Sequence, residues 1–132
     1  MQRLLVRTRQ RCELVEITAE LEELVRARGG SGVLVVQSLH TTAALTINEN
    51  ADPDVPHDLL AKLERLVPRD EPFYLHAEGN SDSHLKTSFF GPSLTLLYED
   101  GRLVLGRWQG VFLAEFDGPR ERTVAVVLIV ES

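Results

Sequence analysis

The strongest constraint on the fold is a series of extended apolar segments joined by short turns in the last third of the sequence. Residues 94–106, 108–116 and 122–130 are rich in Val, Leu, Ile and Phe, which favour strands. Asp-Gly at 100–101 suits a two-residue hairpin turn with positive φ at both positions. Residues 117–121 form a second turn cluster. Strands joined by such turns are antiparallel, which argues against a parallel βαβ arrangement.

Helix patterns interrupt the strands in the first two thirds of the sequence. Residues 19–29 carry apolar residues at helical spacing, and we expect Thr18 to cap this helix and Gly29 to end it. A second helix is predicted with Asp52 as its cap and Pro53 as its first residue, and Pro68 is expected to end it. The apolar residues expected to pack in this helix are Leu59, Leu60, Leu63, Leu66 and Val67.

A third, short helix is predicted over residues 80–91, which begin with cap residues and end with a glycine. Leu85 and Phe89 lie four positions apart, so we expect them to pack inward. His84 and Ser88 have the same spacing and share a polar side.

Seven or eight strands and two or three helices predict a mainly antiparallel α+β fold. The chain has 132 residues and 43% hydrophobic content, which suits one core and one domain spanning residues 1–132. The other predicted strands cover residues 4–8, 12–17, 32–40 and 45–50.

Composition excludes several classes of partner. The 14 Lys and Arg residues against 20 Asp and Glu give a net charge of -6, which argues against nucleic-acid or lipid phosphates as partners. No apolar run approaches the length of a signal peptide or a membrane span, so we expect a cytoplasmic protein. Cys12 is the only cysteine, so no internal disulfide can form.

Three of the four histidines lie where different elements could meet. His40 ends a predicted strand, His76 precedes a polar loop and His84 lies on the short helix. Three neutral imidazoles from three elements could bind one divalent metal and leave a position open for substrate or water. The spacing matches no short metal motif, however, and a single histidine is more often a hydrogen-bonded core or surface residue.

Other polar residues suggest catalysis or phosphate binding. The start of the short helix, residues 79–81, could bind an anion, with Lys86 adding a charge, although such residues are usually only caps. Glu49 lies in a turn rich in Asn and Asp, which could supply a general base or oxygen ligands for magnesium. Gln109 and Glu115 share one face of a strand, where a glutamate could act as an acid or base or lie at a polar rim.

Three long motifs resemble the YjbQ-like family in the family's own order. They are HTTAALTINENADPDVPHDL, YLHAEGNSDSHLKTS and LGRWQGVFLAEFDGPRERTV, and the similarity covers nearly the whole chain. The resemblance implies a β-sandwich-like α+β fold, a homotrimer and the activity of a secondary thiamine-phosphate synthase.

The resemblance also implies roles for particular residues. His40, His76 and His84 occupy the family's histidine positions and would bind the metal near a subunit boundary. The motifs also contain the possible catalytic residues Glu49, Gln109 and Glu115 and the possible phosphate ligands Asn48, Lys86 and Ser88.

The implied reaction joins a pyrimidine methyl diphosphate to a thiazole phosphate and releases diphosphate. It requires a divalent cation: three imidazoles suit zinc or another transition metal, whereas magnesium would bind with the diphosphate. The alternatives are a trimeric metal-dependent module that binds a phosphorylated metabolite without turnover, and a metal-dependent phosphate-ester hydrolase. Arg107 stands where the family commonly has Thr, and it adds phosphate affinity or obstructs substrate only if it points into the site.

Overall fold

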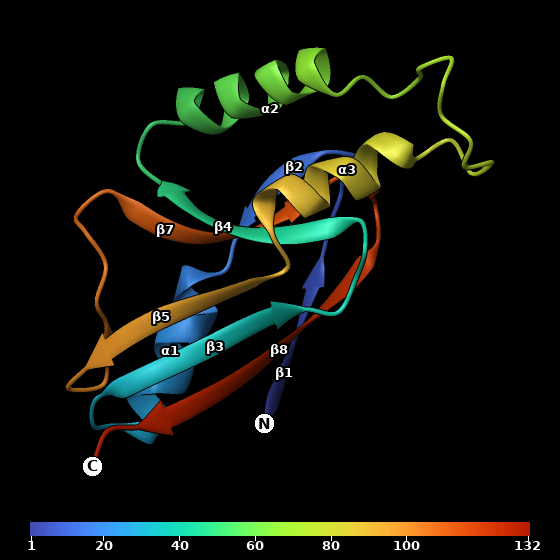
Figure 1. Cartoon of the computed structure of the whole chain (residues 1–132). Coiled ribbons are helices and arrows are strands. Elements are labelled where there is room, and N and C mark those ends of the chain that lie inside the picture. The colour runs from blue at the N-terminus through green and yellow to red at the C-terminus, as the bar shows by residue number, and fades with distance from the viewer.

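The strands predicted from the turn pattern form two antiparallel sheets in the computed structural model, which describes residues 1–132. The larger sheet has the order β1-β8-β3-β5-β6 and the smaller the order β2-β7-β4. Three helices complete the predicted α+β fold (Figure 1). The elements are β1 (Gln2–Arg7), β2 (Glu13–Glu16), α1 (Thr18–Arg28), β3 (Gly32–Ser38), β4 (Ala43–Glu49), α2 (Asp54–Leu66), α3 (Ser81–Phe90), β5 (Ser93–Glu99), β6 (Arg102–Leu103), β7 (Gln109–Glu115) and β8 (Glu121–Val130).

The main core is formed by residues of the two sheets and α1. Leu21 and Val25 of α1 are fully buried, as their spacing predicts. The helix ends at Gly29, whose φ of 69° is the left-handed conformation expected of a glycine there. Thr18 does not cap α1, because its hydroxyl accepts a hydrogen bond from Val111 N of β7. The sheet residues of this core include Leu34, Val36, Leu45, Leu96, Val111, Leu113, Val124 and Val126.

The β5–β6 hairpin turns through Asp100 and Gly101, whose φ values of 49° and 74° confirm the predicted turn. A Cβ at Gly101 would meet its nearest neighbour at 3.8 Å, so space is not the constraint. We expect Gly101→Ala to destabilise the protein by about 1 kcal/mol through backbone strain alone. Urea denaturation measures this change, and an unchanged midpoint would contradict it.

The helices α2 and α3 lie over the smaller sheet, on the side away from the larger one (Figure 1). Asp52 accepts a hydrogen bond from Asp54 N at 2.9 Å. The helix α2 begins at Asp54, one residue after the predicted first residue Pro53. No residue within α2 is fully buried, because Leu60 and Leu63 contact only a small cluster around Phe116. Leu66 is exposed, contrary to the predicted packing.

The helix α3 has its predicted length, but it buries a different face from the predicted one. Leu85 and Phe89 were expected to pack inward, yet they are 39% and 68% exposed. The buried residues of α3 are Asp82, Ser83, Lys86 and Thr87. The polar face can be buried because charged and carbonyl groups from β1–β2, α2 and β7 bind it.

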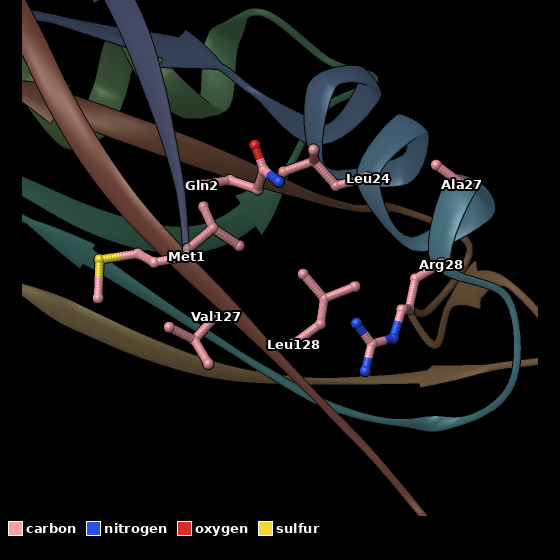
Figure 2. A pocket seen from close by; sticks show the side chains of 8 residues that line it. Met1, Gln2, Leu24, Ala27, Arg28, Val127 and Leu128 are labelled. Atoms are coloured by element: carbon pink, nitrogen blue, oxygen red, sulfur yellow. The ribbon is translucent and has the colours of Figure 1, made fainter.

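The outer face of the larger sheet carries exposed apolar residues, among them Leu97, Val127 and Ile129. A mostly apolar pocket of about 270 Å³ lies between α1 and the ends of β1 and β8 (Figure 2). Arg28 is its only charged lining residue. None of the helices is long and apolar enough to cross a membrane.

Candidate functional site

A polar pocket of about 410 Å³ contains all three histidines singled out in the sequence. They come from the β3–β4 turn, the segment before α3 and α3 itself. Its single apolar lining residue is Leu39. The other lining residues are His40, Thr41, Thr42, His76, Glu78, Asn80, His84, Asp117, Arg120 and Arg122.

His40 is held by one hydrogen bond at its backbone and one at its ring. Its own N–H donates to the Ser38 hydroxyl at 3.3 Å, and its Nε2 accepts the N–H of Thr123 at 2.8 Å. A ring nitrogen that accepts a hydrogen bond carries no proton, so the neutral ring carries its proton on Nδ1. Burial lowers the pKa of His40, and the charges of Arg122 and Arg120 lower it further. His40 is therefore neutral at pH 7 with an N–H at Nδ1.

His76 and His84 are close neighbours. Their ring centroids are 5.2 Å apart, and the rings are perpendicular. His76 Nε2 lies 3.8 Å from Glu78 Oε2, beyond hydrogen-bond distance. Neither ring makes a hydrogen bond within the chain, so both can bind a ligand or a cation.

One wall of the pocket is a buried ion pair between Glu115 and Arg122. Arg122 Nε donates to Glu115 Oε1 at 2.8 Å, and Nη2 donates to Glu115 Oε2. Glu115 also accepts hydrogen bonds from the Thr8 hydroxyl and Asp117 N. Burial raises the pKa of Glu115, but these hydrogen bonds more than offset it and the net pKa is lowered. Glu115 as a catalytic base stays a prediction, and both of its carboxylate oxygens accept hydrogen bonds from Arg122 in this structure.

A second group of polar contacts links the start of α3 to the β7–β8 turn. Asn80 Nδ2 donates to Asp117 Oδ2 at 2.8 Å, and Arg120 donates to the same oxygen at 3.3 Å. Asn80 precedes α3 but makes no side-chain cap hydrogen bond. The contact with Asp117 instead fixes the start of α3 against the turn.

Lys86, predicted to bind phosphate, lies outside this pocket. Its side chain is 1% exposed, and Nζ donates to Asp82 at 2.9 Å and to Glu64 at 3.4 Å. Arg11 donates to both oxygens of the same Asp82 carboxylate. Lys86 is therefore part of a structural ion network. Ser88 is exposed on α3, also outside the pocket.

The remaining predicted residues lie near a second pocket of about 520 Å³, which Glu49 lines with Trp108. Asn48 Oδ1 accepts the N–H of Glu49, and Gln109 Oε1 accepts the N–H of Gly106. The chain does not bring these residues together with the histidines. Glu49 as a general base stays a prediction.

Arg107 is directed onto the neighbouring Trp108. Its guanidinium carbon lies 4.7 Å from the centroid of the Trp108 ring, and both residues are exposed. This is a cation–π contact. Arg107 does not line the histidine pocket, so it neither adds a charge there nor obstructs it.

The sequence reasoning missed Arg122, Arg120 and Asp117. All three lie in the last quoted motif. Asp117 and Arg120 belong to the turn at 117–121, which the sequence indicates only as a connection, and Arg122 begins the predicted last strand. The sequence signal that could have identified this group is Arg122. It is the one charged residue between Glu121 and the apolar run that ends β8, and a charge there needs a partner if it is buried.

The residues fit the three-histidine metal site only in part. No group of three or more His, Cys, Asp or Glu side chains in residues 1–132 is arranged to hold a metal ion. The Nε2 lone pair of His40 accepts the Thr123 N–H, and its Nδ1 carries the proton. This leaves His76 and His84 as imidazoles with a free ring nitrogen.

Comparison with known proteins places the chain in a family. Residues 2–131 match the family described as UPF0047 protein YjbQ-like. The chain belongs to the YjbQ family. UPF0047 protein MJ1081 of Methanocaldococcus jannaschii is 46% identical over 94% of this chain and 90% of its own length. UPF0047 protein YugU of Bacillus subtilis is 42% identical over 94% and 95%.

Solved structures agree with this assignment to the YjbQ family. The conserved hypothetical protein TT1486 from Thermus thermophilus is 49% identical, with a TM-score of 0.93 over 98% of this chain and 100% of its own. A YbjQ-like protein of unknown function from Sulfolobus solfataricus is 31% identical, with a TM-score of 0.92 over 98% and 96%. Sequence and structure therefore give the same family and fold.

Proposed function

We propose that this YjbQ-family chain binds small phosphorylated substrates in the histidine pocket and acts as a secondary thiamine-phosphate synthase. The observation that carries the proposal is the meeting of His40, His76 and His84, from three separate segments, in one polar pocket. The family resemblance supplies the identity of the reaction.

The reaction requires stabilisation of diphosphate as the leaving group. The bond between the pyrimidine methylene carbon and the diphosphate oxygen breaks, and the oxygen keeps the electron pair. The ring nitrogen of the thiazole phosphate forms the new bond to the same carbon. Fixed donors near the diphosphate oxygens stabilise the charge that develops on them. His40 Nδ1–H and Arg120 are donors in this pocket.

We propose that a divalent cation takes part, bound by His76 and His84 and by oxygens of the substrate. Zinc and other transition metals suit the two imidazoles, and magnesium suits the diphosphate oxygens. A bound cation would supply charge neutralisation for the diphosphate. His76 and His84 would hold this cation in the pocket.

We further propose that the protein is a homotrimer, as the family resemblance implies. Exposed apolar residues support an assembly, because an uncovered surface of this kind is costly in water. Leu75 is 97% exposed, and Phe73 and Phe89 are also exposed. Light scattering with size-exclusion chromatography should give three times the 14.8 kDa mass of one chain.

We expect His84→Ala to lower the rate of thiamine-phosphate formation by about 100-fold or more, because His84 is one of the two proposed ligands of the cation that neutralises the diphosphate. The assay supplies both precursors with a series of divalent metals and measures diphosphate release. His57→Ala is the matched control, because His57 is an exposed histidine on α2 outside the pocket.

Three other results would contradict the synthase proposal. Equal loss in His57→Ala would mean that the effect is not specific to the pocket. Substrate binding without turnover in any metal would favour a binding module. Release of phosphate from a simple ester without the second precursor would favour a hydrolase.

A further inference from the structure

Arg122 is a buried cation with donors that no protein group uses. The residue is 3% exposed and lines the histidine pocket. Its Nε and Nη2 donate to Glu115, and Nη2 also donates to the Thr42 hydroxyl at 2.8 Å. These contacts fix the plane of the guanidinium group. Nη1 makes no hydrogen bond to the chain.

We infer that Nη1 is accessible from the pocket. Four side-chain polar atoms of the chain are both buried and without a partner, and Arg122 Nη1 is not among them. A side-chain polar atom that has no hydrogen-bond partner and is not one of these four retains some contact with solvent. Because Arg122 lines the histidine pocket, we place this contact in the pocket. Glu115 thus holds the guanidinium from behind while Nη1 faces the ligand space.

His40 supplies a second fixed donor in the same pocket. Thr123 N–H occupies Nε2, so the proton of the neutral ring lies on Nδ1. Reversing the ring would place a carbon atom against the Thr123 N–H, and carbon cannot accept that hydrogen bond. The backbone of β8 therefore sets the tautomer.

We propose that Arg122 Nη1 and His40 Nδ1–H together bind a phosphoryl oxyanion, and that His40 is an anion donor and not a metal ligand. Charged donors held rigidly form short, strong hydrogen bonds to phosphate. The inference deepens the proposed function and rests on it for the identity of the substrate. It replaces Lys86 as the source of phosphate affinity.

The pocket contains two carboxylates, Asp117 and Glu78, and their negative charges repel a bound anion to different extents. Asp117 already accepts hydrogen bonds from Asn80 and Arg120, so its charge is balanced. Glu78 has an exposed side chain 3.8 Å from His76 and belongs with the two histidines proposed to bind a cation. The charges of the pocket thus suit a cation paired with a phosphoryl group.

The test is a calorimetric titration with inorganic diphosphate, with inorganic phosphate and acetate as comparison anions. We expect Arg122→Lys to weaken diphosphate binding about tenfold or more, because lysine keeps the charge beside Glu115 but loses the planar donors. His40→Phe should weaken diphosphate binding to a similar extent. His40→Asn should keep most of the affinity of the unmodified protein, because its side-chain N–H can donate to the anion. Arg3→Gln removes an exposed charge on β1 and should change binding less than twofold.

Unchanged diphosphate affinity in both Arg122→Lys and His40→Phe would overturn the inference, as would an equal loss in Arg3→Gln. Acetate binding as tightly as diphosphate would overturn the assignment to a phosphoryl group. If diphosphate binds as expected but no thiamine phosphate forms, the inference stands and the proposed function fails.

Nitrogen NMR of the unmodified protein gives a test that does not depend on the variants folding. We expect His40 to show a protonated Nδ1 and an unprotonated Nε2, and its signals to shift on addition of diphosphate. Zinc should shift the ring signals of His76 and His84 but leave the Nδ1 proton of His40 in place. Loss of that proton on adding zinc, or the opposite tautomer, would overturn the inference.

Discussion

Asp82→Asn is expected to lower the free energy of unfolding by about 3–5 kcal/mol, the usual result of removing one partner of a buried ion pair. Asp82 is fully buried in α3 and accepts hydrogen bonds from Arg11 at 3.0 and 3.1 Å and from Lys86 at 2.9 Å. The asparagine has nearly the same shape, so the loss measures charge and not volume. Lys86 would be left buried with only Glu64 as a partner.

Urea denaturation of Asp82→Asn and of a matched variant, Asp58→Asn, tests this prediction. Asp58 is an exposed carboxylate on α2, and its loss should cost less than about 1 kcal/mol. Adding Lys86→Met to Asp82→Asn should recover part of the stability, because the buried ammonium is then removed and only the partly exposed Arg11 still lacks a carboxylate partner. Similar losses in the two single variants would mean that the buried network contributes little.

The same carboxylate predicts a pH dependence. Burial raises the pKa of Asp82, but hydrogen bonds from Arg11 and Lys86 more than offset it, so the folded pKa is below the ordinary value. A lowered folded pKa means that the stabilisation is complete above the unfolded pKa of about 3.9 and is lost as pH falls toward the folded pKa. Unfolding free energies measured between pH 2 and 6 should fall more steeply with acid in the unmodified protein than in Asp82→Asn.

Glu115→Gln is expected to destabilise the protein by a similar amount, about 3–5 kcal/mol. Glu115 is fully buried on β7 and is the only carboxylate that pairs with Arg122, which is itself buried on β8. Neutralising Glu115 leaves that guanidinium charge uncompensated between the two sheets. Thermal and urea unfolding measure the change.

The control for Glu115→Gln is Glu121→Gln, which breaks the exposed pair with Arg7 and should cost less than about 1 kcal/mol. The double variant Glu115→Gln with Arg122→Met should be more stable than Glu115→Gln alone. If it is not, the loss comes from the hydrogen bonds to Thr8 and Asp117 and not from the unpaired charge.

The order of strands and helices could be predicted from the sequence because local signals define it. Gly29 and Gly91 end helices through positive φ, and the pair Asp100 and Gly101 turns the β5–β6 hairpin. These effects depend on residues close in the chain. Which face of α3 is buried could not be predicted in this way, because its polar side is bound by Arg11, which lies 71 positions from Asp82.

The candidate site, like the fold, could be predicted from the sequence only in part. The sequence by itself determined the family, the α+β class and the three histidines of interest, because these follow from motifs and local periodicity. Only the tertiary structure decided that Lys86 and Glu115 are held in buried ion pairs and that Arg122 lines the pocket. The physical reason is that the availability of a charged group depends on which distant residue already holds it. In this chain Asp82 holds Lys86, and Thr123 holds Nε2 of His40.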